Sequence, residues 1–330
     1  MLMDSHHRVI DYLRVAVTDR CNLRCLYCMP EEGIQPLPHG EILSYEEILR
    51  VARVAVGLGI SKVRLTGGEP LVRRDLESLV RALAGLEGIR DLSMTTNGVL
   101  LKDRARDLRQ AGLKRINVSL DSLDPQRYRA ITRGGELERV WEGILAALEA
   151  GMHPVKINVV AMEEHNGDEI LSFARLSIGW PLEVRFIERM PLGAQGCCPP
   201  GKFLSAQAIL DRLKEVYPLE PLAAKTGNGP AQLYRISNGL GTIGIIAPMT
   251  QHFCHSCNRL RLTPEGKLRA CLFSDQEVDL KGLLRSSASE QALREKIQEA
   301  ISRKPSRGSP GAQADLRVKK CVRPMSRIGG

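Results

Sequence analysis

Short apolar runs alternate with amphipathic segments over the first two thirds of the chain. The apolar runs predict strands at 13–17, 63–65, 92–95, 116–120, 155–160 and 183–187. Between them, apolar positions three and four residues apart predict helices, one of which begins with a capping box at Ser44 and Glu47. Gly112 and Gly151 are placed to end two later helices. Strand–helix repetition of this kind is typical of a parallel sheet with crossover helices.

The pattern changes after about residue 230. Candidate strands at 233–236 and 242–246 are joined by Ser-Asn-Gly, and those at 260–263 and 268–271 flank Pro-Glu-Gly. Turn residues between short apolar runs predict antiparallel hairpins. We therefore expect six βα units followed by an antiparallel appendage, with a division into residues 1–232 and 233–330. The Ser-, Gly- and Pro-rich stretch at 304–314 predicts a mobile loop.

Composition narrows the class of protein. With 43% hydrophobic residues the chain is not predominantly disordered, and no apolar run approaches the ~18 residues of a membrane span. The net charge of +9 favours an anionic partner: nucleic acid, a membrane surface or a phosphorylated small molecule. An aromatic content of 4% argues against single-stranded nucleic acid. The start of the chain lacks the apolar core of a secretory signal, so we expect a cytoplasmic protein.

The cysteines indicate metal rather than disulfides. Nine is an odd number in a chain that is neither small nor rich in secretory features. Six of them form two triplets, Cys21, Cys25, Cys28 and Cys254, Cys257, Cys271, while Cys197, Cys198 and Cys321 are predicted to be spare thiols. Three thiolates on one loop can hold three irons of a [4Fe–4S] cluster and leave the fourth iron open. Zinc with a further ligand is the alternative, and it is stronger for the second triplet because His252 and His255 lie nearby.

Other motifs point to bound ligands: the glutamate beside two glycines suits a cation, whereas the arginines and the lysine within strands favour an anion. Thr-Gly-Gly-Glu-Pro at 66–70 directly follows the second predicted strand. Arg259 and Arg261, between cysteines of the second triplet, are typical of an anion clamp. Arg14 and Lys156 interrupt apolar strands, and such a cation must face water or a ligand because burying it unpaired is costly.

The first triplet, with Tyr27 before its last cysteine, and the Gly-Gly-Glu-Pro motif resemble the radical S-adenosylmethionine superfamily. With the second triplet, the Arg-Leu-Arg at 259–261 and the terminal Gly-Gly, the chain resembles the GTP 3′,8-cyclase family of molybdenum cofactor biosynthesis from about residue 8 onward. This resemblance implies an incomplete (βα)6 TIM-like barrel whose open side is closed by the C-terminal region. It also implies a lyase-type conversion of GTP to (8S)-3′,8-cyclo-7,8-dihydroguanosine 5′-triphosphate, in which a 5′-deoxyadenosyl radical abstracts the ribose 3′ hydrogen.

The resemblance further implies two [4Fe–4S] clusters and S-adenosyl-L-methionine as cofactors. Cys21, Cys25 and Cys28 would hold the first cluster, and Cys254, Cys257 and Cys271 the second. S-adenosylmethionine would contact Tyr27, Gly68, Ser119 and Met190, and GTP would contact Arg14, Arg64, Thr95, Lys156, Arg259, Leu260 and Arg261, although Thr95 could line the S-adenosylmethionine pocket instead. The catalytic set would be the first three cysteines with Gly329 and Gly330, which would reach into the active site.

The implied partners are GTP, a cellular one-electron donor and a downstream pyranopterin-forming enzyme, with a homodimer suggested by family alone. No stable nucleic-acid complex and no membrane are expected. Two alternatives stay open at this point. One is another radical S-adenosylmethionine enzyme with an auxiliary cluster, such as one that modifies a peptide. The other is a non-enzymatic iron–sulfur or zinc protein, and affinity for GTP separates all three.

Overall fold

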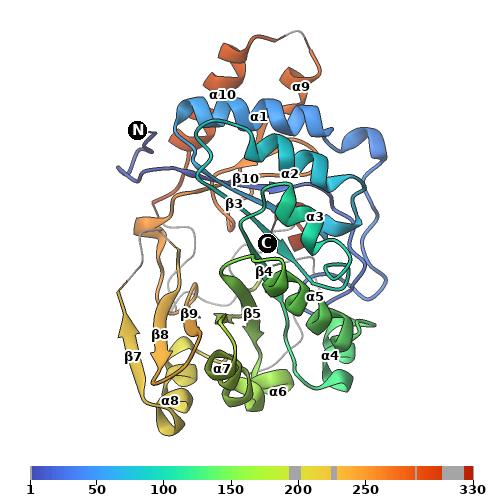
Figure 1. The fold of residues 1–330 in the computed structure, drawn as a ribbon. Helices are drawn as coiled ribbons and strands as arrows, with labels where there is room; N and C mark the ends of the chain where they lie inside the picture. Colours follow the sequence, from blue (N-terminus) through green and yellow to red (C-terminus); the bar gives the residue numbers. More distant parts are fainter. Residues whose placement is uncertain (1, 193–201, 224–228, 287, 307–322, 330) are drawn as a thin grey trace.

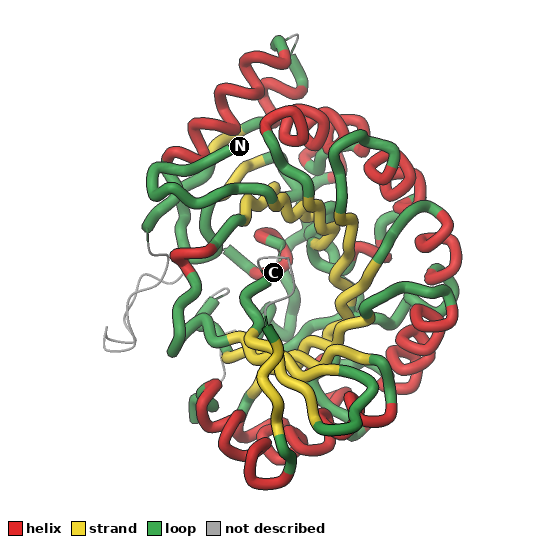
Figure 2. Tube along the Cα trace, turned by 60° about the vertical axis from the view of Figure 1, so that its left-hand side comes forward, coloured by secondary structure: helices red, strands yellow, loops and turns green. Residues whose placement is uncertain are grey.

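The computed structural model describes residues 2–192, 202–223, 229–286, 288–306 and 323–329. Twelve strands lie in these ranges: β1 (Tyr12–Ala16), β2 (Lys62–Thr66), β3 (Asp91–Thr96), β4 (Arg115–Ser119), β5 (Val155–Ala161), β6 (Leu182–Glu188), β7 (Leu219–Leu222), β8 (Gln232–Ile236), β9 (Thr242–Ile246), β10 (Arg259–Leu262), β11 (Lys267–Arg269) and β12 (Val278–Asp279). They form one sheet in the order β12-β11-β10-β1-β2-β3-β4-β5-β6-β9-β8-β7. The sheet is curved, with helices along its outer side and the C-terminal residues on its inner side (Figures 1 and 2).

The helices follow the strands as the sequence predicts. They are α1 (Tyr45–Leu58), α2 (Leu76–Ala84), α3 (Ala105–Gln110), α4 (Pro125–Thr132), α5 (Leu137–Glu149), α6 (Glu163–Asn166), α7 (Ile170–Gly179), α8 (Ala206–Val216), α9 (Lys281–Leu284), α10 (Glu290–Ser302) and α11 (Met325–Ile328). The predicted capping box begins α1: Ser44 Oγ accepts from the Glu47 amide, and the Glu47 carboxylate accepts from the Ser44 amide at 2.7 Å. No helix in the described ranges is both long and apolar enough to cross a bilayer.

All six predicted strands of the repeating region are confirmed as β1–β6, and each is parallel to the next. The hairpins β8–β9 and β10–β11 are antiparallel, as expected, although β11 ends at Arg269 rather than Cys271. The sequence did not indicate β7, β12 or two parallel pairings, β9 with β6 and β10 with β1. These pairings satisfy the open edges of the six-stranded sheet, so the C-terminal region extends both edges instead of forming a separate antiparallel unit.

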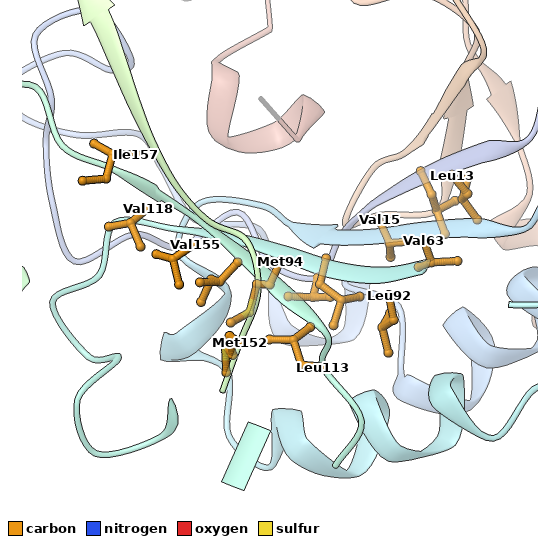
Figure 3. Packing of buried hydrophobic residues seen from close by; sticks show 14 of the residues in the cluster. Leu13, Val15, Val63, Leu92, Met94, Leu113, Val118, Met152, Val155 and Ile157 are labelled. Atoms are coloured by element: carbon orange, nitrogen blue, oxygen red, sulfur yellow. The ribbon is translucent and has the colours of Figure 1, made fainter. Parts of the chain in front are cut away.

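The hydrophobic core lies between the sheet and the helices. Leu13 and Val15 of β1 pack there with Val63, Leu92 and Met94 of the next two strands (Figure 3). Successive strand residues point to opposite faces, so the residues between these apolar ones point to the concave inner side. The core therefore fixes which side chains can form a site inside the curve of the sheet.

Several expectations fall on residues outside the described ranges. These are the predicted spare thiols Cys197, Cys198 and Cys321, the terminal Gly330, and residues 307–314 of the predicted mobile loop. Within that loop, residues 304–306 are described.

Candidate functional site

A large cavity lies on the concave side of the sheet, with a volume of about 1430 Å³. This exceeds the ~300–1,000 Å³ typical of a pocket for one small ligand. Strand alternation supplies its polar wall: Arg14 lines it between the core residues Leu13 and Val15, and Asn117 and Ser119 line it from β4. The cavity is therefore large enough for two ligands that meet inside the sheet.

The cavity brings together most of the site residues predicted from sequence. Those that line it are Arg14, Cys21, Cys25, Tyr27, Cys28, Arg64, Gly68, Thr95, Ser119, Lys156, Met190, Cys254, Cys257, Arg259, Arg261 and Cys271. Leu260 does not belong with them. Its side chain is completely buried in the hydrophobic core, because it alternates along β10 with the two arginines. The Leu260 side chain therefore does not face the cavity, and the predicted contact between this residue and GTP stays a prediction.

The first cysteine triplet lies on the loop that follows β1, and the Gly-Gly motif packs directly beneath it. The Gly68 amide donates to the Thr18 carbonyl oxygen at 2.8 Å. A Cβ on Gly67 would lie 2.3 Å from that same oxygen, and one on Gly68 would lie 2.2 Å from the Arg20 carbonyl oxygen. Only glycine allows the two loops to approach so closely. The motif thus sets the position of the cysteine loop.

Burial disfavours free thiolates in this triplet. It raises the pKa of Cys21 to about 11 and the pKa of Cys25 well above its usual range, with Cys28 and Asp121 adding to the effect on Cys25. The Leu23 amide and the Asn97 side-chain amide are nevertheless directed at Cys21 Sγ, at 3.4 and 3.9 Å. Three cysteines on one loop, two of them with raised pKa values and one receiving N–H groups, fit the ligands of a cubane iron–sulfur cluster.

The Tyr27 side chain links this loop, through hydrogen bonds, to the residues that follow β4 and to β5. Its hydroxyl donates to Asp121 Oδ2 at 2.6 Å, and Asp121 Oδ1 accepts from the Val160 amide at 2.8 Å. Burial raises the pKa of Asp121 to about 6, although both hydrogen bonds act in the opposite direction. The side chain of Tyr27 therefore has a structural role, and the predicted backbone contact with adenine stays a prediction.

The second triplet has the opposite electrostatic surroundings. Burial acts to raise the pKa of Cys257, but Lys304 and Arg259 outweigh it, so the pKa lies below its usual value. Lys304 Nζ donates to the carbonyl oxygens of Arg259 and Ala270 at 2.8 and 2.5 Å, which holds its charge beside the triplet. These surroundings favour the thiolate of Cys257, the form in which cysteine binds iron or zinc.

The two triplets lie at opposite ends of the cavity. Cys21 follows the C-terminal end of β1, whereas Cys257 precedes Arg259, the first residue of β10, which is parallel to β1 and pairs there with Tyr12. Cys271 returns to the same end as Cys257 because β11 runs antiparallel to β10. In the described ranges, no three His, Cys, Asp or Glu side chains converge on the position of one ion. Convergence is not required of thiolates that each bind a different iron of a cubane.

A cationic wall separates the two ends. Arg14, Arg64, Lys156 and Arg261 are between 5% and 8% exposed. Burial lowers the pKa of all four groups, to about 8 for Lys156 and to about 10 for Arg261, and repulsion by neighbouring arginines adds to the effect. Lys156 pairs with Glu183 at 2.7 Å. Such concentration of buried positive charge fits a polyanionic ligand.

Sequence reasoning missed several other residues that line the cavity near this wall. Lys62, Arg115 and Arg185 line the cavity, as do Tyr12 and Asn117. Arg185 shares Glu183 with Lys156, and Arg64 lies 5.6 Å from the centre of the Tyr12 ring. The signal that could have found them is the one applied to Arg14: polar residues at alternate positions of predicted strands.

The C-terminal segment enters this cationic region. Arg14 Nε donates to the Gly329 carbonyl oxygen at 3.2 Å, and Arg261 donates to the same oxygen. Gly329 has φ of +66°, and a Cβ there would lie 2.7 Å from Thr66 Cγ2, next to the Gly-Gly motif. The described part of the tail is thus in contact with two of the predicted GTP-binding arginines.

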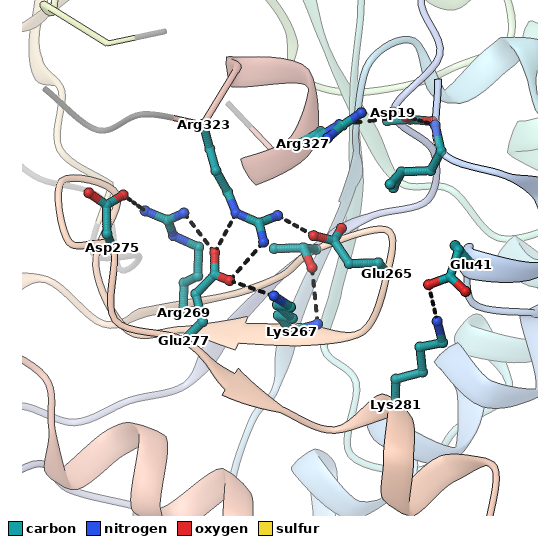
Figure 4. A network of polar contacts seen from close by, with 12 residues as sticks. Asp19, Glu41, Glu265, Lys267, Arg269, Asp275, Glu277, Lys281, Arg323 and Arg327 are labelled. Carbon is teal, nitrogen blue, oxygen red and sulfur yellow. Dashed lines mark hydrogen bonds and ion pairs between the residues drawn. The ribbon is translucent and has the colours of Figure 1, made fainter. Parts of the chain in front are cut away.

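Ion pairs hold the tail in this position (Figure 4). Arg323 donates to Glu265 and, at 2.8 Å, to Glu277. Glu277 also accepts from the fully buried Arg269 at 2.9 Å. Further along the tail, Arg327 Nε lies 3.7 Å from Asp19 Oδ2, on the loop before the first cysteine triplet (Figure 4). No local sequence pattern indicates this anchor, since its members come from distant segments.

The curved parallel sheet and the cysteine loop after β1 are typical of the radical SAM superfamily, and comparison with known families supports this class. Residues 15–177 match the family model of the radical SAM superfamily, and residues 182–310 match that of Molybdenum Cofactor Synthesis C. A protein of Pelotomaculum thermopropionicum named GTP 3′,8-cyclase is 51% identical over 330 residues, which is 100% of both chains. Its namesake in Listeria monocytogenes is 44% identical over 334 residues, 100% of this chain and 99% of that one. The chain belongs to the GTP 3′,8-cyclase family.

Solved structures share the fold at low identity. Streptococcus suis SuiB bound to S-adenosylmethionine superimposes with a TM-score of 0.60 and 15% identity, over 87% of this chain and 68% of that chain. The anSMEcpe enzyme with bound AdoMet gives a TM-score of 0.55 and 13% identity, over 88% of this chain and 79% of that chain. At such identity the likeness concerns the fold alone.

Proposed function

We propose that this chain converts GTP to (8S)-3′,8-cyclo-7,8-dihydroguanosine 5′-triphosphate, an early step of molybdenum cofactor biosynthesis. Membership of the GTP 3′,8-cyclase family supports this function. The observation that carries the proposal is one cavity with a cysteine triplet at each end and a buried cationic wall between them. An enzyme that brings a radical source to a triphosphate needs both features in one enclosed space.

Each cysteine triplet would hold a cluster. Cys21, Cys25 and Cys28 would bind one [4Fe–4S] cluster, and Cys254, Cys257 and Cys271 would bind another. When bound, the first cluster and S-adenosylmethionine supply the radical that starts ring closure on GTP. Unpartnered buried oxygens of Thr95 and Asn117 on the cavity wall support the presence of polar ligands there.

The protein's own residues bind and orient the two ligands. The cationic wall of Arg14, Arg64, Lys156 and Arg261 would hold the triphosphate, together with the less buried Arg259. Tyr27, Gly68, Ser119 and Met190 would line the S-adenosylmethionine pocket, with Thr95 between the two ligands. The tail would join them, because the arginines that hold the Gly329 carbonyl also face the triphosphate. Enclosure by the tail would keep water from the reacting atoms.

The remaining expectations belong to the same proposal. We infer an incomplete (βα)6 barrel from the six consecutive parallel strands, and the division at residues 232 and 233 stays a prediction, since one sheet joins both parts. A one-electron donor, a downstream pyranopterin-forming enzyme, a homodimer and a cytoplasmic location also stay predictions.

Anaerobic reconstitution with iron and sulfide tests the proposal. We expect about eight irons per chain, corresponding to two clusters. Addition of dithionite, S-adenosylmethionine and GTP should then give 5′-deoxyadenosine and the cyclised nucleotide. Cys25→Ala and Cys271→Ala form a matched pair, because each should lose about four irons while keeping the other cluster. The cyclised product should be absent from both.

Three results would contradict the proposal. About four irons with one tightly bound zinc would remove the second cluster. Formation of 5′-deoxyadenosine without any binding of GTP would indicate a different radical S-adenosylmethionine enzyme, such as one acting on a peptide. Binding of nucleic acid with steep salt dependence, without 5′-deoxyadenosine formation, would indicate a non-enzymatic protein.

A further inference from the structure

Lys304, the second residue after α10, lies buried beside the second cysteine triplet although it comes from a distant part of the chain. The residue is 3% exposed. Its Nζ donates to the carbonyl oxygen of Arg259 on β10 at 2.8 Å and to that of Ala270, just after β11, at 2.5 Å. Arg259 follows Cys257 by two positions, and Ala270 directly precedes Cys271. One ammonium group thus joins the two segments that carry these cysteines.

The charge of this ammonium group is directed at the cysteines. Both hydrogen-bond acceptors are neutral carbonyl oxygens, and burial lowers the pKa of Lys304. Attraction by Cys257 and Cys271 acts in the opposite direction. Lys304 is in turn the strongest cationic influence on Cys257, ahead of Arg259 and Arg261. Because a buried charge without a counter-charge is costly, the lysine and the ionised triplet stabilise each other.

Arg8 holds this arrangement from the N-terminal segment. It is 7% exposed, and its guanidinium donates to the carbonyl oxygen of Cys254 at 2.8 Å and to that of Pro305 at 2.7 Å. The orientation of Arg8 is fixed in turn by Asp4, whose Oδ2 accepts from Arg8 Nε at 2.6 Å. One guanidinium group therefore joins the remaining cysteine of the triplet to the residue directly after Lys304.

We propose that Lys304 is a positioning residue for the second iron–sulfur cluster, which it retains and whose reduced state it favours, while Arg8 holds the lysine in place. This inference rests on the proposed function, in which the second triplet holds a [4Fe–4S] cluster. Reduction adds a negative charge to such a cluster, and a cation close to its thiolates stabilises that charge. Groups around the ligands are known to tune both the affinity and the potential of a metal site. A neutral side chain at position 304 should therefore make the cluster harder to reduce and easier to lose.

The test measures each cluster separately in the reconstituted full chain. Cys25→Ala keeps the second cluster and Cys271→Ala keeps the first, so Lys304→Met is introduced into both, and reduction is followed anaerobically by EPR at poised potentials. In the Cys25→Ala parent, Lys304→Met should lower the ratio of reduced to oxidised cluster about 10-fold at a given potential, which corresponds to a midpoint ~59 mV more negative. In the Cys271→Ala parent the same change should leave the potential unchanged, because the first cluster lies at the opposite end of the cavity.

Retention of the cluster gives a second readout that does not depend on activity. With EDTA as the iron chelator, the second cluster should lose iron about 10-fold faster in Lys304→Met than in its Cys25→Ala parent. Lys304→Arg keeps the positive charge and should lie closer to the parent in both measurements. Lys281→Met is the matched control, because the Lys281 side chain is 20% exposed and pairs with Glu41 away from the cavity lining. Both values should be unchanged in this control.

The outcomes separate this inference from the proposed function. A second cluster in Lys304→Met with the potential of its parent would overturn the inference and leave the two-cluster function standing. If Lys304→Met holds no second cluster, Lys304→Arg decides: a cluster in that variant supports the role of the charge, and its absence from both variants assigns Lys304 a packing role and overturns the inference. Wild-type protein that takes up only about four irons would overturn the proposed second cluster, and the inference with it.

Discussion

Arg323 is the residue whose removal most directly tests how the C-terminal tail is held. It lies just after residues 307–322, which separate the tail from the rest of the described chain, and it bridges Glu265 and Glu277 (Figure 4). Arg323→Ala removes both ion pairs. Glu277 keeps Arg269 and Lys267 as partners, so we expect the β11–β12 region to stay folded.

The magnitude follows from burial. The Arg323 side chain is 22% exposed and those of Glu265 and Glu277 are 10% and 13% exposed. Exposed pairs contribute up to about 1 kcal/mol and broken buried pairs cost about 3–5 kcal/mol, so an intermediate loss of about 2 kcal/mol is expected. This corresponds to a roughly 30-fold weaker docking of the tail.

Hydrogen exchange of the amides in residues 323–329 measures this docking without any bound cofactor. Exchange should be about 30-fold faster in Arg323→Ala, intermediate in Arg323→Lys, and unchanged in Arg127→Ala, which breaks the exposed pair with Asp168. The thermal midpoint should stay close to that of the wild type. Unchanged exchange in Arg323→Ala, or an equal increase in the Arg127→Ala control, would refute the anchoring role.

Two further predictions concern the cationic wall and the glycine motif. Because burial and Arg185 lower the pKa of Lys156 to about 8, its positive charge is present below that pH and is lost above it. GTP affinity, measured by titration from pH 7 to 9, should therefore fall as pH rises through about 8, and Lys156→Arg should flatten the profile; a wild-type affinity that stays constant would contradict this. Gly68→Ala would bring a Cβ to 2.2 Å from the Arg20 carbonyl oxygen, so we expect iron loading to fall by about half through loss of the first cluster. Gly282→Ala, which meets nothing within 4 Å, should load iron normally, and normal loading of Gly68→Ala would disprove the steric argument.

Much of the fold could be predicted because the signals are local. An apolar run flanked by turn residues predicts a strand wherever it lies, and the capping box at Ser44 and Glu47 begins a helix through contacts three residues apart. The edge strand β7 and the short β12 were missed, since Leu219–Leu222 includes a proline and Val278–Asp279 spans only two residues.

The candidate site was partly predictable for a different reason. Cysteine triplets and arginines inside strands are uncommon enough that their presence alone indicates chemistry. Asn117 carries no such signal, because an asparagine in a strand is ordinary until its oxygen is found buried and unpaired. Leu260 shows what such a motif leaves open: its neighbours in the Arg-Leu-Arg motif face the cavity, but alternation along β10 places its side chain in the core.

The sequence by itself determined the elements, the metal-binding residue types and the family resemblance, since each depends on residues close together in the chain. Only the tertiary structure decided that the second triplet lies across the cavity from the first. That arrangement depends on β10 pairing in parallel with β1, which joins Arg259 to Tyr12 across most of the chain. It also decided that Arg14 and Arg261 meet at the Gly329 carbonyl. Such long-range pairings leave no local pattern in the sequence. They form because the complete fold must pair its open sheet edges and provide partners for its buried charges.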